Sequence, residues 1–173
     1  AAEGNPSLLF AYAMGKAQRI LAGVDPTTGP IFTHGAVESI VQAYRDAGIR
    51  QPPTRAVAEA RMKGEFSGAP VVAPPSAEGA TWMRRFVNAS RAFASGWMQI
   101  RGNRRRRSLD RGFVLSDHAD WKGLLDTIEA SGAERIWVTH GYAAEVVQFL
   151  KEKGLSAVAV GTAFSGETEA PGA

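Results

Sequence analysis

The 173-residue chain is 45% hydrophobic, carries a formal net charge of +3 and contains no cysteine. This length suits one ordinary domain or two small lobes with a real core. No apolar run approaches the roughly 18 residues of a membrane-spanning helix, and the opening lacks the basic-then-apolar pattern of a secretion signal. We therefore expect a cytoplasmic protein with no membrane partner. Without thiolates, a metal site would need carboxylates or the three histidines, His34, His118 and His140.

The first expected element is a helix over residues 5–23, because Asn5 and Pro6 suit a helix start and Gly23 suits a helix end. The elements expected after it are, in order, a strand at 30–33, a helix at 36–48, a break at 51–55, a short helix at 56–64, strands at 71–72, 91–102 and 112–115, a helix at 120–130, a strand at 135–139, a helix at 143–153 and a strand at 157–160. This alternation predicts an α/β fold with a largely parallel sheet.

Two histidines, His118 and His140, follow the expected strands at 112–115 and 135–139. Ligands of such folds gather at the carboxyl ends of the strands. A single histidine in this position is more often structural, but two would share one rim if both strands lie in one sheet. Imidazole can ligate zinc or donate a proton, and both roles suit phosphodiester hydrolysis. No H-x-H or H-E-x-x-H pattern occurs, so the chain is poor in metal ligands.

Charge is distributed unevenly along the chain. Residues 81–111 contain one acid, Asp110, whereas acids outnumber bases from residue 112 onward. The basic residues of the first segment are Arg84, Arg85, Arg91, Arg101, Arg104, Arg105, Arg106, Arg107 and Arg111. This asymmetry indicates a polyanionic partner beside an acidic site. The alternative for the four-arginine run is a solvated hairpin tip.

Several segments carry a family resemblance. They read, in order, "FAYAMGKAQRIL", "GPIFTHGAVESIVQAYRDAG", "VVAPPSAEG", "AFASGWMQIRG", "GFVLSDHADW" and "WVTHGYAAEVVQFL". Over residues 5–165 the chain resembles β-CASP nucleases of the metallo-β-lactamase superfamily, and looks most like bacterial DNA-ligase-associated exonucleases, which are similar to the eukaryotic polyadenylation-site endonuclease. The resemblance implies a metal-dependent hydrolase of nucleic acid, usually with two zinc ions, acting on DNA in repair alongside a DNA ligase.

The resemblance gives each histidine a role. His118 in "SDHAD" matches the second β-CASP motif, whose histidine approaches the scissile phosphate and assists protonation of the leaving group. His140 in "VTHG" matches the third motif, whose histidine ligates a metal. The family's H-x-H-x-D-H motif and remaining acidic ligands precede the "FAYAMGKAQ" segment in related proteins and do not occur here. The chain thus resembles a carboxyl-terminal fragment, which we expect to be inactive alone.

The resemblance also implies a division into lobes. Residues 1–111 would form the β-CASP lobe, incomplete at its start. Residues 112–165 would supply the carboxyl-terminal strands and helices of the metallo-β-lactamase αββα lobe. Residues 166–173 are expected to be a disordered tail, because "GETEAPGA" is polar and lacks periodicity.

Candidate substrate-binding residues are Lys16, Arg19, Ser76, Arg104 and Arg105. Lys16 and Arg19 lie one helical turn apart and could face a phosphate, the alternative being a solvated helix face. Ser76 follows a double proline beyond a buried strand, where it could bind a phosphate oxygen or sit in an ordinary turn. Arg104 and Arg105 belong to the four-arginine run, which would grip a nucleic-acid strand.

Four further side chains receive other interpretations. Asp117 adjoins His118 and could orient it, whereas Asp120 suits a helix cap. Trp82 and Trp97 flank the basic segment and could stack on bases, although core packing is the more common use of tryptophan. His34 is expected to be structural or peripheral.

Three alternatives to a DNA nuclease stay open. The chain could be a non-catalytic nucleic-acid-binding module, an RNA-processing β-CASP endonuclease or exonuclease, or an α/β hydrolase acting on a small phosphorylated or acyl substrate. Salt-sensitive binding without cleavage favours the first, and failure to bind any nucleic acid at low salt favours the last.

Overall fold

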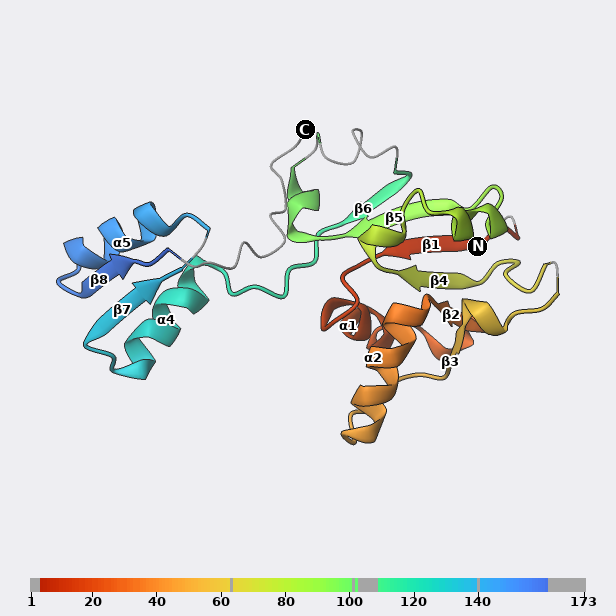
Figure 1. Ribbon diagram of the computed structural model, residues 1–173, viewed down its shortest axis with the longest axis horizontal. Helices are drawn as coiled ribbons and strands as arrows, with labels where there is room; N and C mark the ends of the chain where they lie inside the picture. The colour runs from red at the N-terminus through yellow and green to blue at the C-terminus, as the bar shows by residue number, and fades with distance from the viewer. Residues whose placement is uncertain (1–3, 63, 101, 103–108, 140, 162–173) are drawn as a thin grey trace. The chain divides into compact units, whose positions relative to one another are not determined.

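The computed structural model describes residues 4–62, 64–100, 102, 109–139 and 141–161. The chain divides into two compact units, with the boundary between Asp117 and His118 (Figure 1). The predicted α/β class is confirmed, because a parallel sheet alternates with helices along the described chain. The lobe boundary expected near residue 111 stays a prediction. None of the helices in the described residues is long and apolar enough to cross a membrane.

The first unit is built on a six-stranded sheet in which every pairing is parallel. The strand order is β3-β2-β4-β1-β5-β6. The strands are β1 (Ser7–Phe10), β2 (Ile31–Thr33), β3 (Thr54–Ala56), β4 (Pro70–Ala73), β5 (Ser90–Ala94) and β6 (Arg111–Phe113). Because all strands run the same way, the segments that follow them leave from one edge of the sheet.

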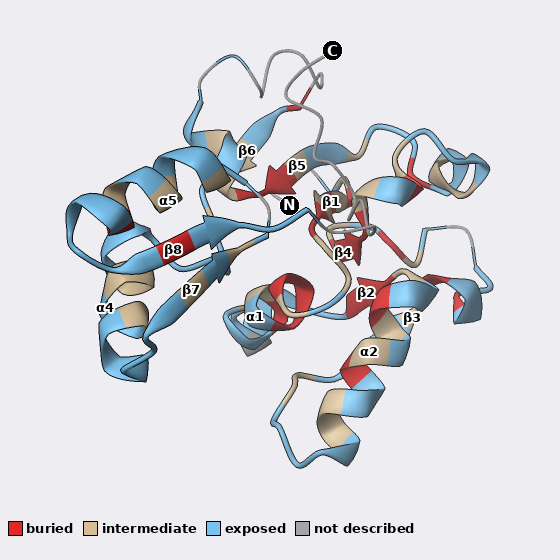
Figure 2. Ribbon diagram, turned by 60° about the vertical axis from the view of Figure 1, so that its left-hand side comes forward, coloured by how far each residue is buried: buried red, intermediate tan, exposed pale blue. Residues whose placement is uncertain are grey.

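Each face of this sheet has its own core, since successive strand residues point to opposite faces. Helices α1 (Lys16–Ala22) and α2 (Gly35–Asp46) cover one face (Figure 1). Their core comprises Ala17, Leu21, Ile31, Val37, Val41 and Val72. The short 3-10 turns η2 (Val57–Glu59) and η4 (Thr81–Arg85) contribute to the opposite core, which contains Leu8, Phe10, Phe32, Phe66, Val71, Phe86 and Phe93. Figure 2 shows buried residues concentrated in β1, β2, β4 and β5.

The prediction of one helix over residues 5–23 is wrong. Residues Ser7–Phe10 form β1, and α1 begins only at Lys16. Strand β1 lies between β4 and β5, and its residues Leu8, Leu9 and Phe10 form a short apolar run in which Leu8 and Phe10 are buried and Leu9 is half-buried. Such a short run has no periodicity that separates a buried strand from a buried helix. Gly15, with a φ of 76°, provides the turn between the two elements.

The region 51–64 also differs from expectation. The predicted break contains part of β3, an edge strand that pairs only with β2, and the predicted helix at 56–64 is the single turn η2. Prolines preceding β3 conceal a strand of three residues from pattern analysis.

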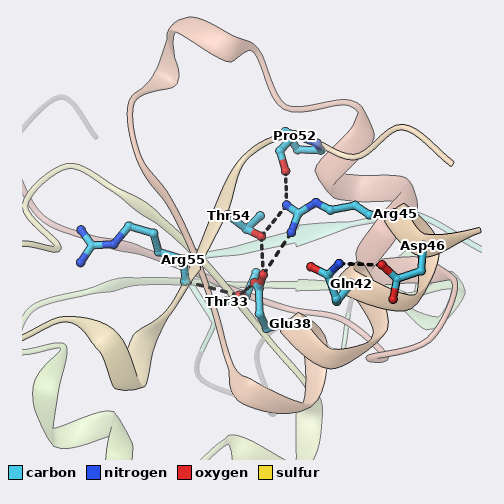
Figure 3. Close-up of polar contacts among 8 residues, drawn as sticks. All are labelled: Thr33, Glu38, Gln42, Arg45, Asp46, Pro52, Thr54 and Arg55. Carbon is cyan, nitrogen blue, oxygen red and sulfur yellow. Dashed lines mark hydrogen bonds and ion pairs between the residues drawn. The ribbon is translucent and has the colours of Figure 1, made fainter. Parts of the chain in front are cut away.

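Polar contacts attach β3 to α2 (Figure 3). The guanidinium of Arg45 donates to the Pro52 carbonyl at 2.6 Å and to the Thr54 hydroxyl at 2.9 Å, and lies 3.3 Å from the Glu38 carboxylate. That carboxylate also accepts hydrogen bonds from the hydroxyls of Thr54 and Thr33. These bonds use the charged groups of α2 to hold the sheet edge.

The second unit contains β7 (Arg135–Val138) and β8 (Ser156–Ala159), paired in parallel, with α4 (Trp121–Ser131) and α5 (Ala143–Glu152). These elements confirm the predicted alternation. The predicted cap is also confirmed, because the Asp120 carboxylate accepts the Gly123 amide proton at 2.7 Å. Trp121 and Phe149 join the two helices, with ring centroids 4.9 Å apart.

Truncation of Phe10 should distinguish a strand at residues 7–10 from a helix that continues through residue 23. Phe10 is fully buried, whereas Met14 is 69% exposed, although both would share one face of a helix. We expect Phe10→Ala to lower the free energy of unfolding by about 3–5 kcal/mol and Met14→Ala by less than about 0.5 kcal/mol. Urea unfolding of both variants measures this. Equal losses would contradict the strand.

Candidate functional site

The carboxyl edge of the sheet in the first unit brings together two segments that are far apart in sequence. The loop after β1 leads into Lys16, and the segment after β6 leads to Asp117. The Lys16 ammonium lies 3.0 Å from the Asp117 carboxylate and 4.8 Å from the centre of the Tyr12 ring. The Lys16 side chain is only 4% exposed and that of Asp117 is 36% exposed. Lys16 is therefore a buried cation whose charge is balanced within the protein.

Arg19 makes a parallel contact one helical turn further along α1. Its Nη1 donates to the Ser116 carbonyl at 3.1 Å. Gly15 approaches the same segment, since a Cβ built there would lie 3.7 Å from the Asp117 carboxylate. The structure thus brings Lys16, Arg19 and Asp117 together, and the three residues fix the chain immediately before His118. Phosphate binding by Lys16 and Arg19 stays a prediction.

Other predicted residues occupy different positions along this edge. Ser76 is exposed in the 3-10 turn η3 (Pro75–Ala77) that follows β4. His34 caps α2, since its Nδ1 accepts the Ala36 amide proton at 3.2 Å. The His34 ring packs against Trp82 with centroids 5.3 Å apart. Trp82 also donates to the Ala77 carbonyl at 2.9 Å, so both rings have structural contacts.

The two histidines that anchor the functional hypothesis follow strands that belong to different sheets. His118 is exposed at the start of the second unit, while His140, like Arg104 and Arg105, lies outside the described residues. Strand β6 pairs with β5, and β7 pairs with β8, so the preceding strands belong to different sheets. The condition for a shared rim is therefore not met.

The implied zinc ions do not fit the part of the chain that the structure describes. No group of three or more histidine, aspartate or glutamate residues there lies close enough to hold a metal ion. Asp117, the acid beside His118, is engaged by Lys16. A metal site would therefore need ligands from elsewhere.

Two carboxylates away from this edge, Glu65 and Asp25, have a lowered side-chain pKa. Two backbone N–H bonds, from Met62 and Arg61, lower the pKa of Glu65, with a further contribution from Arg55. The pKa of Asp25 is lowered chiefly by the Thr27 amide and then by its hydroxyl. Since the folded-state pKa is lowered in both, each stabilises the fold above its unfolded-state pKa, and this is lost as pH falls through the folded-state pKa. Each of the two carboxylates therefore stabilises a local turn by accepting backbone N–H hydrogen bonds.

The basic segment contains arginines of two kinds, which the sequence did not distinguish. Arg85 donates to the carbonyls of Val57 and Ala60, each at 2.7 Å, and lies over the Phe66 ring. By contrast, the exposed Arg84 and Arg91 line a surface hollow, and their guanidinium groups make no hydrogen bond or ion pair within the described residues. Only the folded contacts show which arginine is structural.

Comparison with known proteins gives one informative match. The chain is 34% identical over 160 residues to a protein of Opitutus terrae (strain DSM 11246 / JCM 15787 / PB90-1) named "Probable DNA ligase". The alignment spans 92% of this chain and 15% of that relative. No family model matches the chain, and no solved structure matches it.

Removal of the Asp117 charge should measure how much that carboxylate stabilises the buried Lys16 ammonium. We expect Asp117→Asn to lower the free energy of unfolding by about 1–3 kcal/mol, because an ammonium would stay buried without its carboxylate. Lys16→Met/Asp117→Asn should lose less than the single variant. Asp46→Asn is the control, since Asp46 is exposed and its carboxylate accepts a hydrogen bond from the side-chain amide of Gln42 rather than balancing a buried charge. Urea unfolding of the unaltered chain and of the three variants measures these free energies. Equal effects of Asp117→Asn and Asp46→Asn would contradict the buried pair.

Proposed function

We propose that the chain is part of a metal-dependent nuclease that acts on DNA and is functionally associated with a DNA ligase. The match to a relative named for DNA ligation, across 92% of the chain, carries this proposal. That alignment covers a small part of the relative, so ligation itself is not transferred to these residues. The β-CASP resemblance supplies the finer hypothesis of phosphodiester hydrolysis.

The second unit supports a larger catalytic lobe. Trp137 and Val158 are register partners on β7 and β8, and are 66% and 42% exposed. Parallel sheets are normally covered on both faces, and a two-stranded sheet is rarely stable by itself. Large exposed apolar side chains on such a sheet favour additional strands or helices packing there in the whole protein. This fits the terminal portion of a metallo-β-lactamase-like lobe.

The first unit would contribute contacts to the phosphate backbone. Its described basic residues include exposed arginines whose charges are not used in the fold, and the four-arginine run at 104–107 follows in the sequence. Arginine contacts to phosphate supply affinity but little base specificity. His118 and His140 keep the roles implied by the resemblance, as leaving-group acid and metal ligand, and both depend on ligands that this chain does not provide.

A non-catalytic nucleic-acid-binding module is the second candidate. The basic residues of segment 81–111, with Asp110 as the one acid of that segment, favour it, because contacts to the phosphate backbone need no metal. The two candidates differ in whether His140 matters for cleavage by the whole protein.

Salt-dependent DNA binding provides the test. The 173-residue chain should bind a fluorescein-labelled single-stranded oligonucleotide, and about three phosphate contacts would weaken affinity roughly 20-fold between about 50 and 200 mM salt. With zinc or manganese added, this chain should not cleave the strand. Anisotropy and gel analysis measure the two properties. Absence of binding at low salt would contradict the nucleic-acid proposal, and robust cleavage would contradict the incomplete site.

An experiment on the whole protein distinguishes a nuclease from a non-catalytic binding module. His140→Ala in that protein should abolish cleavage while leaving DNA affinity within about twofold, because backbone arginines supply the affinity. Unchanged cleavage would contradict the metal-ligand role.

A further inference from the structure

A hollow beside the start of β5 combines two exposed positive charges with a partly apolar floor. Its volume is about 310 Å³, at the lower end of the roughly 300–1,000 Å³ range of ligand sites. The lining residues are Gly79, Ala80, Thr81, Met83, Arg84 and Arg91. No carboxylate is among these residues, so the described lining favours an anion.

The backbone that carries Arg84 is fixed by its neighbours. Trp82 is bonded to the Ala77 carbonyl, and Arg85 is bonded to the carbonyls of Val57 and Ala60. Met83 packs against the core, and its sulfur accepts the Gly79 amide proton at 2.9 Å. The turn η4 is therefore anchored on both sides of Arg84, whose side chain lines the hollow.

Arg91 is held from the other side of the hollow. Its amide donates to the Asp110 carboxylate at 2.7 Å, and its carbonyl accepts the Asp110 amide proton at 3.0 Å. Within the described residues, the guanidinium groups of Arg84 and Arg91 make no hydrogen bond or ion pair with the protein. Two such groups at one hollow repel each other, and an anion bound between them would remove that repulsion.

The lining suits one chemical class of ligand. Guanidinium groups bind phosphate oxygens in a bidentate geometry, and the Thr81 hydroxyl adds a donor. The side chains of Met83 and Ala80 provide apolar surface for an adjoining sugar. We propose that this hollow binds a phosphodiester group of a nucleic-acid strand, an inference that rests on the proposed function and assigns a phosphate contact to Arg84 and Arg91.

Paired charge removal tests the assignment. Arg84→Gln/Arg91→Gln should weaken binding of a labelled single-stranded oligonucleotide by at least about tenfold and flatten the logarithmic salt dependence by about 0.7, the value for one phosphate contact on a single strand. The control is Arg50→Gln/Arg61→Gln, which removes the same charge from exposed arginines outside the hollow. It should change affinity less than about threefold with an unchanged salt slope. Equal losses in the two double variants would overturn the proposal.

Further experiments distinguish failure of the hollow assignment from failure of the proposed function. If the unaltered chain binds DNA and only Arg104→Ala/Arg105→Ala weakens it, the hollow is excluded while DNA binding stands. If the unaltered chain does not bind, the proposed function fails as well. Inorganic phosphate, at the same phosphate concentration as unlabelled oligonucleotide, should displace the labelled strand less effectively. Equal displacement would indicate a site for small anions and overturn the phosphodiester assignment.

Circular dichroism checks that each variant is folded. Arg84→Lys/Arg91→Lys provides a milder substitution, which keeps the charges but removes bidentate geometry. It should fall between the unaltered chain and the glutamine variant in affinity. Affinity equal to that of the unaltered chain would overturn the role of the guanidinium groups.

Discussion

Parallel pairing around the central strand β1 is the constraint on which the first unit depends. Strand β1 pairs with β4 and β5 on its two sides, and its residues Leu8 and Phe10 belong to the larger core of the unit. Since every strand runs in the same direction, the loops after β1 and β6 leave from the same edge. The contact of Arg19 with Ser116, 97 positions apart in the sequence, and that of Lys16 with Asp117 then become possible.

These contacts change the interpretation of the basic side chains on α1, Lys16 and Arg19, only in part. A lysine that is 4% exposed and paired with a carboxylate stabilises the edge of the sheet and holds the last residues of the first unit. Backbone binding of nucleic acid depends more naturally on guanidinium groups that the fold leaves unused, such as Arg84 and Arg91. Neighbouring arginines in one sequence segment thus divide between structure and proposed binding.

Sequence patterns predicted the α/β class and most elements with good bounds, because α2, α4 and α5 are amphipathic and their caps are local features. The pattern failed at β1, where a short apolar run does not separate a strand from a helix, and at β3, where pairing with β2 and bonds from Arg45 make a strand of a proline-flanked segment. The site was predicted less completely. The pairing of Lys16 with Asp117, and the difference between Arg84 and Arg85, arise from tertiary contacts that no local pattern encodes.

The proposed function depends most on contact between the parallel-sheet unit and a nucleic-acid backbone. Hydrogen–deuterium exchange of the 173-residue chain, with and without a single-stranded oligonucleotide at low salt, tests this directly. We expect slower exchange on binding in residues 79–91, around the hollow beside β5. Protection confined to α4 and α5, or no protection anywhere in the chain, would contradict it.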